Sequence, residues 1–136
     1  IVGDKIDEIK SKIDTTYDLI ITTGGVSKGD ADFTTEVFRE SGYNIKFGWI
    51  AIKPGKPFGF AIGKNIATLL TGNPLAAIFN YNIFVKPLIR KLAGCNSYYI
   101  DYINLKSSNT LRRKAGRDEV IPVNLVNDYI VLRSEE

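Results

Sequence analysis

Residues 18–25 read Asp18-Leu19-Ile20-Ile21-Thr22-Thr23-Gly24-Gly25, a short apolar and β-branched run that stops at two glycines. Such a run predicts a buried strand followed by a turn. Upstream of it, Ile6, Ile9 and Ile13 recur at helical spacing among charged residues, which predicts an amphipathic helix. A helix followed by a buried strand is typical of α/β winding.

The chain beyond this strand continues the α/β pattern. Gly42 and Gly94 are expected to end helices, Asn73 to cap one as its N-cap, and Pro74 to occupy its first turn. Pro87 should either kink the last helix or divide it in two. In chain order we predict a loop over 24–31, a helix over 32–41, strands over 45–52, 58–62 and 66–70, and a helix over 74–93.

Beyond Gly94 the sequence pattern changes to alternating polar and apolar residues. This alternation predicts strands over 98–105, 119–126 and 129–133, with a hairpin turn at Asn127-Asp128. We therefore predict two units. Residues 1–94 form an α/β domain, a three-layer wound fold with a mostly parallel sheet, and residues 95–136 form the start of an incomplete antiparallel β domain.

Composition limits the chemistry that this chain can perform. Of its 136 residues 44% are hydrophobic and 24% charged, enough for a packed core. One cysteine, Cys95, and no histidine exclude an internal disulfide, a Cys/His zinc finger and a Ser-His-Asp triad. No apolar run approaches the ~20 residues that cross a bilayer, so we expect a soluble, intracellular protein without membrane contact. Because the sequence opens at Ile1 and holds no methionine, we expect a piece of a longer protein.

Charge is distributed unevenly along the chain. Residues 1–40 hold nine acidic and five basic side chains, whereas residues 41–100 hold seven basic side chains and no acidic one. A basic surface without carboxylates suits an anionic ligand, although a solvated face balanced by residues 1–40 is the alternative. Nucleic acid is not expected, because the basic residues are spread over several elements without interleaved aromatics.

Three loops are expected to meet at one edge of the sheet: Gly24–Asp32, Lys53–Pro57 and Thr71–Leu75. If the strand over 58–62 reverses between its neighbours, the strands over 18–23, 45–52 and 66–70 all end at that edge, where open α/β sheets bind ligands. Backbone amides beside glycines, two lysines in a proline-stiffened loop and the amides of a helix start can all bind anions. Each signal alone is equally typical of an ordinary turn or cap.

Two aspartates stand in the first of these loops. Asp30 and Asp32 would stay ionised beside lysines and phosphate, and carboxylate oxygens are suitable ligands for Mg²⁺. The alternative is that one of them, Asp32 above all, caps the helix over 32–41. A metal bound here would act as a Lewis acid in the cleavage of a phosphoanhydride.

Three segments together resemble the molybdopterin molybdenumtransferase family, MoeA-type proteins that include the E domain of gephyrin. They are Gly24-Gly25-Val26-Ser27-Lys28-Gly29-Asp30-Ala31-Asp32-Phe33, Lys53-Pro54-Gly55-Lys56-Pro57 and Gly72-Asn73-Pro74. The resemblance implies a molybdopterin-binding-like fold and an enzyme of molybdenum cofactor biosynthesis. That enzyme inserts molybdate into adenylylated molybdopterin with release of AMP and with Mg²⁺, in the cytoplasm and as a homodimer of the full-length protein.

The resemblance also implies roles for individual residues. Gly24, Gly25, Val26 and Ser27 would cradle the pterin or its phosphate. The segment Lys53, Pro54, Gly55, Lys56 and Pro57 would meet molybdate or phosphate, and Gly72, Asn73 and Pro74 would complete the pocket. Asp30 and Asp32 would serve catalysis and metal binding. The sequence departs from the family at Thr71, where proline is usual, and at Ala76, where a small hydroxyl residue is usual.

Two other functions stay open. One is a molybdopterin adenylyltransferase of the related single-domain fold, which would attach AMP. If the chain is instead a molybdenumtransferase, the adenylyltransferase is a possible partner. The other is a gephyrin-like scaffold that binds a partner peptide without catalysis. Three further side-chain expectations are structural: Trp49 in the core, Cys95 without redox function, and Arg112, Arg113 and Lys114 in a solvated turn.

Overall fold

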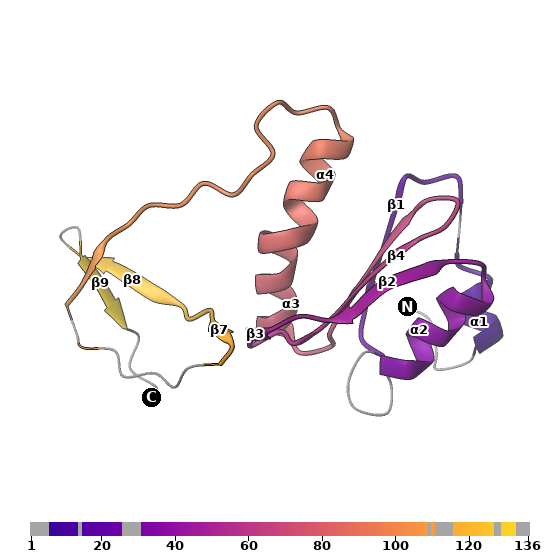
Figure 1. Ribbon diagram of the computed structural model, residues 1–136, viewed down its shortest axis with the longest axis horizontal. Coiled ribbons are helices and arrows are strands. Elements are labelled where there is room, and N and C mark those ends of the chain that lie inside the picture. Colours follow the sequence, from indigo (N-terminus) through magenta and orange to yellow (C-terminus); the bar gives the residue numbers. More distant parts are fainter. Residues whose placement is uncertain are drawn as a thin grey trace.

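The computed structural model describes residues 6–13, 15–25, 31–108, 110, 116–126 and 129–132, with the backbone alone for Ala31, Asp32 and residues 129–132. A four-stranded sheet lies between helices on both of its faces (Figure 1). Its strands, in the spatial order β1-β5-β4-β2, are β1 (Leu19–Thr23), β5 (Ile66–Leu70), β4 (Pro57–Ile62) and β2 (Asn44–Trp49). The fold is therefore mixed α/β.

The sheet is mixed rather than mostly parallel, which corrects the prediction. β1 and β5 pair parallel, whereas β4 pairs antiparallel with both β5 and β2. The hairpin at Gly63-Lys64-Asn65 causes this, because it turns the chain directly from β4 into β5, and the Gly63 amide donates to the Asn65 carbonyl across it. β1, β5 and β2 still run in one direction, as the loop argument required.

Each face of the sheet packs against its own helices. α1 (Ile6–Lys10) and α2 (Ala31–Glu40) lie on one face, joined by an ion pair between Lys10 and Glu40. Neighbouring residues of β5 point to opposite faces, so they contribute to different cores. The core on the α2 side holds Phe38, Tyr43, Ala61, Ala67 and Leu69; the core under the long helix holds Phe58, Leu70 and Val85.

The long helix on the second face is continuous through Pro87. It consists of α3 (Pro74–Asn80), a π-helical turn η1 (Tyr81–Val85) and α4 (Lys86–Leu92), drawn as one rod in Figure 1. Pro87 has no amide to donate to the preceding turn, and the wider π turn just before it accommodates this loss without dividing the helix. Gly94, at φ 77°, and the Cys95 amide bonded to the Arg90 carbonyl end the helix as predicted.

The segment after the helix differs from its predicted strands. Residues 98–105 are not in a strand, and the predicted strand over 119–126 is two strands, β7 (Asp118–Glu119) and β8 (Val123–Val126). Alternation gave the wrong result at 98–105 because a strand also needs a hydrogen-bonded neighbour along its length. β9 (Tyr129–Leu132) lies where a strand was predicted; the turn residues Asn127 and Asp128 are outside the described residues.

The small C-terminal sheet is mixed as well, not antiparallel throughout. β8 and β9 pair antiparallel, but β6 (Lys106–Ser107) pairs parallel with β9. The predicted strand over 45–52 ends at Trp49 and resumes as β3 (Ile52–Lys53), which pairs parallel with β7. The pairing of β3 with β7 joins residues on both sides of the predicted domain boundary between residues 94 and 95. The boundary itself stays a prediction. None of the helices in the described ranges is long and apolar enough to span a membrane.

Candidate functional site

The turns after β1 and β5 touch each other at one edge of the sheet. Thr23 lies opposite Leu70 in the parallel register, and the Gly24 amide donates to the Leu70 carbonyl at 3.0 Å. A Cβ on Gly72 would come within 3.4 Å of the Gly24 Cα, so the two glycine backbones are in near contact. Two of the three predicted loops are thus neighbours.

The third loop starts from the same edge. β2 ends at Trp49 opposite Pro57, the first residue of β4, and Phe58 of β4 lies opposite Leu70. Residues 53–57 therefore lie at the end of the sheet where β1, β2 and β5 finish. The topology brings the three segments to one sheet edge, as the sequence predicted.

The turn at Gly24 and Gly25 depends on its glycines and on α2. Both residues have positive φ, 90° and 66°, a conformation that costs other residues energy. The Gly25 carbonyl accepts a hydrogen bond from Thr34 Oγ1 at 3.1 Å, so α2 holds the turn. The next residues, Val26, Ser27 and Asp30, lie outside the described residues, and of Asp32 only the backbone, in α2, is described.

The start of α3 is capped as predicted. Asn73 Oδ1 accepts from the Ala76 amide at 3.0 Å, and Pro74 occupies the first turn. The buried Thr71 hydroxyl accepts from the Asn73 amide at 3.3 Å, so Thr71 orients the cap residue. The Ala76 amide is thus used by the cap, and the Ala77 amide donates to the Asn73 carbonyl as the first bond of the helix.

Lys53 carries an ion pair that the sequence did not predict. Its Nζ lies 3.0 Å from Glu119 Oε1 of β7, and the Val120 amide donates to the Lys53 carbonyl at 2.9 Å. The partner comes from 66 residues further along the chain, so no local pattern could have revealed it. The lysine expected to meet an anion thus already meets a carboxylate.

Lys56 lies beside an exposed tryptophan. Its Nζ is 5.6 Å from the centre of the Trp49 ring, a cation–π distance, and its carbonyl accepts from the Ile50 amide at 2.9 Å. Trp49 is 64% exposed, so the prediction that it packs in the core is wrong. β2 is an edge strand whose register shifts between Phe47 and Trp49, so a place in this strand does not bury the Trp49 ring.

Asn80 is the site residue that sequence reasoning missed. Its Nδ2 donates to the Gly55 carbonyl at 2.9 Å and lies 3.5 Å from the Pro57 carbonyl. Gly55 has φ 111°, and a Cβ there would lie 2.6 Å from Asn80 Oδ1, so glycine is required for this approach. The available signal was a polar residue one helical turn after the small, inward-facing Ala76.

Metal ligands are not assembled within the described part of the chain. No group of three or more acidic, histidine or cysteine side chains there is close enough to hold a metal ion. Both predicted Mg²⁺ ligands, Asp30 and the side chain of Asp32, lie outside that part. The magnesium site therefore stays a prediction.

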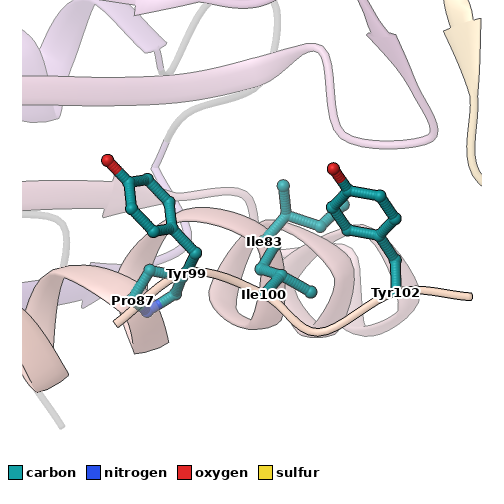
Figure 2. Close-up of a pocket in the computed structure, with 5 residues that line it drawn as sticks. All are labelled: Ile83, Pro87, Tyr99, Ile100 and Tyr102. Carbon is teal, nitrogen blue, oxygen red and sulfur yellow. The ribbon is translucent and has the colours of Figure 1, made fainter. Parts of the chain in front are cut away.

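A separate hollow of about 420 Å³ lies beside the long helix, away from these loops. Figure 2 shows Ile83 and Ile100 between the rings of Tyr99 and Tyr102, with Pro87 beneath Tyr99. Its lining is almost wholly apolar, so its chemistry differs from that of the lysine and glycine loops.

Several known proteins have sequences similar to this chain. Residues 1–91 match the family described as "Probable molybdopterin binding domain". The molybdopterin molybdenumtransferase of Haemophilus influenzae is 50% identical over 78 residues, which are 57% of this chain and 19% of that protein. The molybdopterin molybdenumtransferase of Staphylococcus epidermidis is 38% identical over 98 residues, 71% of this chain and 23% of that protein. The chain thus spans about a fifth of the length of these curated relatives.

A solved structure extends the likeness to the fold. The crystal structure of the molybdopterin biosynthesis MoeA protein of Pyrococcus horikoshii aligns with a TM-score of 0.70 and 25% identity. The alignment covers 98% of this chain and 33% of that one. With a family match over 91 of 136 residues and this shared fold, the chain belongs to the molybdopterin-binding domain family of molybdenum cofactor biosynthesis.

Proposed function

We propose that this chain is the substrate-binding part of a molybdopterin molybdenumtransferase, which inserts molybdate into adenylylated molybdopterin and releases AMP. One observation carries the proposal: segments 24–25, 53–57 and 71–74, each with anion-binding chemistry, start at one sheet edge. The names of the relatives support the reaction. The chain spans about a fifth of those proteins, so we assign the reaction to the full-length protein, acting in the cytoplasm as a homodimer, with the adenylyltransferase as a further partner.

The residues present suit an anionic substrate. Gly24 has open space where a side chain would stand, so a phosphate can approach the backbone there, and the Lys56 ammonium supplies positive charge to phosphate or molybdate. Lys53 is 60% exposed and Glu119 is 23% exposed, so a multiply charged anion arriving from solvent would compete with the Glu119 carboxylate for the Lys53 ammonium. In this proposal Val26 and Ser27 complete the cradle.

Magnesium belongs to the same proposal. Asp30 and Asp32 would hold Mg²⁺ through carboxylate oxygens, and the ion would neutralise charge at the phosphoanhydride. The chain's own contribution is to orient the pterin phosphate against its glycine turn and to keep Lys53 and Lys56 near the anion.

The two lysines provide the first test. We predict that Lys53→Ala combined with Lys56→Ala weakens binding of adenylylated molybdopterin by about tenfold or more, because two cations near a phosphate are removed. The melting temperature should change by less than about 3 °C, since both side chains are exposed. Calorimetric titration and thermal unfolding measure the two quantities. Lys64→Ala, in the hairpin at the opposite end of the sheet, is the matched control.

The reaction itself is measured on the full-length protein with adenylylated molybdopterin and molybdate. Release of AMP that depends on molybdate supports the transferase. Attachment of AMP instead of release would identify an adenylyltransferase, and intact pterin binding without any release would identify a scaffold.

A further inference from the structure

Asn80 is a fully buried amide on the inner side of the long helix, with 0% of its surface exposed. Its Nδ2 contacts the carbonyls of Gly55 and Pro57, the residues on either side of Lys56. A single side chain thus holds the backbone before and after the lysine that the proposed function assigns to the anion.

Other contacts of the loop place Lys56 between fixed points. The Lys56 carbonyl accepts from the Ile50 amide, and the Lys53 carbonyl accepts from the Val120 amide, both at 2.9 Å. Asn80 differs from these anchors because it reaches the loop from the helix layer and not from a neighbouring strand. Without the Asn80 amide, the segment around Lys56 would be held only by the backbone bonds from the Ile50 and Val120 amides just described.

Stability alone does not account for an amide at this position. Asn80 Oδ1 is buried and has no hydrogen-bond partner among the described residues, an arrangement that disfavours folding. Asn65, the other buried asparagine of the described sheet region, uses both ends: Nδ2 donates to the Tyr17 carbonyl and Oδ1 accepts from the Tyr43 hydroxyl. What Asn80 adds is therefore the bond to the loop.

We propose that Asn80 is a positioning residue for anion binding: its amide fixes the backbone around Lys56 and thereby the place of the Lys56 ammonium at the sheet edge. The inference rests on the proposed function for the identity of the ligand, an oxyanion such as molybdate or the phosphate of the pterin. The clamp on residues 55–57 does not depend on that ligand.

The test uses Asn80→Leu and Asn80→Ala in the same chain. Leucine keeps most of the volume and removes the unpaired oxygen, but it leaves the Gly55 carbonyl without its donor, so Asn80→Leu should fold with a melting temperature lowered by about 5 °C. Without ligand, hydrogen exchange at the Ile50 amide should accelerate by about tenfold. Its acceptor is the Lys56 carbonyl, which is held less firmly once the buried hydrogen bond from residue 80 to Gly55 is lost. The dissociation constant for molybdate should rise by a similar factor.

Two controls separate positioning from stability. Asn82→Ala removes an exposed amide of the same helix, which donates to the Ile78 carbonyl one turn earlier, and should change neither quantity. Asn65→Ala removes a buried amide at the far end of the sheet. It should lower the melting temperature while the molybdate affinity of the folded protein stays within about twofold.

Each result decides a separate question. Unchanged exchange at Ile50 in both Asn80 variants would overturn the clamp, and accelerated exchange with unchanged molybdate affinity would overturn its role in binding. If the unaltered protein bound no molybdate, the proposed function and the ligand half of this inference would both fall, whereas the exchange measurement would still decide the clamp.

Discussion

Tyr43 follows α2, and its hydroxyl bonds to the β4–β5 hairpin at the end of the sheet opposite the candidate site. The side chain is 4% exposed, its ring packs edge-on against Phe38, and its hydroxyl donates to Asn65 Oδ1. Gly63 leaves room for this ring, since a Cβ there would lie 2.8 Å from it. Burial raises the pKa of Tyr43, because the phenolate is less well solvated inside the protein.

Tyr43→Phe should reveal that hydroxyl in a pH profile. At pH 7 the variant should lose about 1–2 kcal/mol of unfolding free energy, the value of one buried hydrogen bond. In the unaltered protein the unfolded tyrosine loses its proton near pH 10 while the folded one keeps it. The unfolded state then binds fewer protons, so the contribution of Tyr43 is present below pH 10 and is lost as the pH rises through the folded pKa.

Urea unfolding at pH 7 and at steps above pH 10 measures both effects. The difference between the two proteins should shrink above pH 10. A difference that stayed constant would show that the hydroxyl contributes by packing and not by its proton.

At this scale the sequence predicted well what depends on one residue and its neighbours. The cap at Asn73 and the glycine at position 94 follow from local backbone chemistry, and both lie where expected. Glu119 and Asn80 could not be predicted as partners of the 53–57 loop, because each is brought to it by the fold from a distant position. The prediction that Trp49 is buried was wrong because the sequence does not show the register shift of β2 at this residue.

Helices and strands were predictable where a buried face gives them a clear period. β5 lies between two strands and is buried over four of its five residues, which matches its run of apolar residues around Thr68. Residues 98–105 alternate in sequence, yet Tyr99, Ile100 and Tyr102 line the hollow of Figure 2 and the segment forms no strand. Pairing, which the sequence does not encode locally, decides between these outcomes.

The N-cap of the long helix permits a prediction about that element. Asn73→Ala should lower the unfolding free energy by about 1 kcal/mol, because the Ala76 amide loses its acceptor while Pro74 still starts the helix. Denaturant unfolding measures this loss. Asn73→Asp, which keeps an acceptor oxygen at the helix start, should retain most of the stability. Equal losses in both variants would indicate that the amide nitrogen, and not the cap oxygen, stabilises the helix.

The whole molecule joins an α/β sandwich with two cores to a C-terminal segment of short strands. Both cores consist of residues between Ile13 and Val85, whereas residues 95–136 contribute short strands with exposed apolar side chains. Contacts between the two parts include the β3–β7 bridge with its Lys53–Glu119 ion pair, and the Lys91 ammonium over the Tyr98 ring. The α/β class was predictable from the order of helices and strands, but this bridge was not, since it joins residues on both sides of the predicted boundary.

A chain ending at residue 97 tests that organisation. It keeps both cores and the Cys95 amide that closes the long helix, so it should unfold cooperatively with a loss of no more than about 2 kcal/mol. It loses the amides of Asp118 and Val120, which donate to the carbonyls of Ala51 and Lys53, so any change in hydrogen exchange should be confined to residues near positions 50–56. Circular dichroism during urea unfolding and amide exchange measure these two effects. A non-cooperative transition, or exchange that accelerated throughout β1 and β5, would mean that the sandwich needs the C-terminal segment to fold and that residues 1–94 are not a domain.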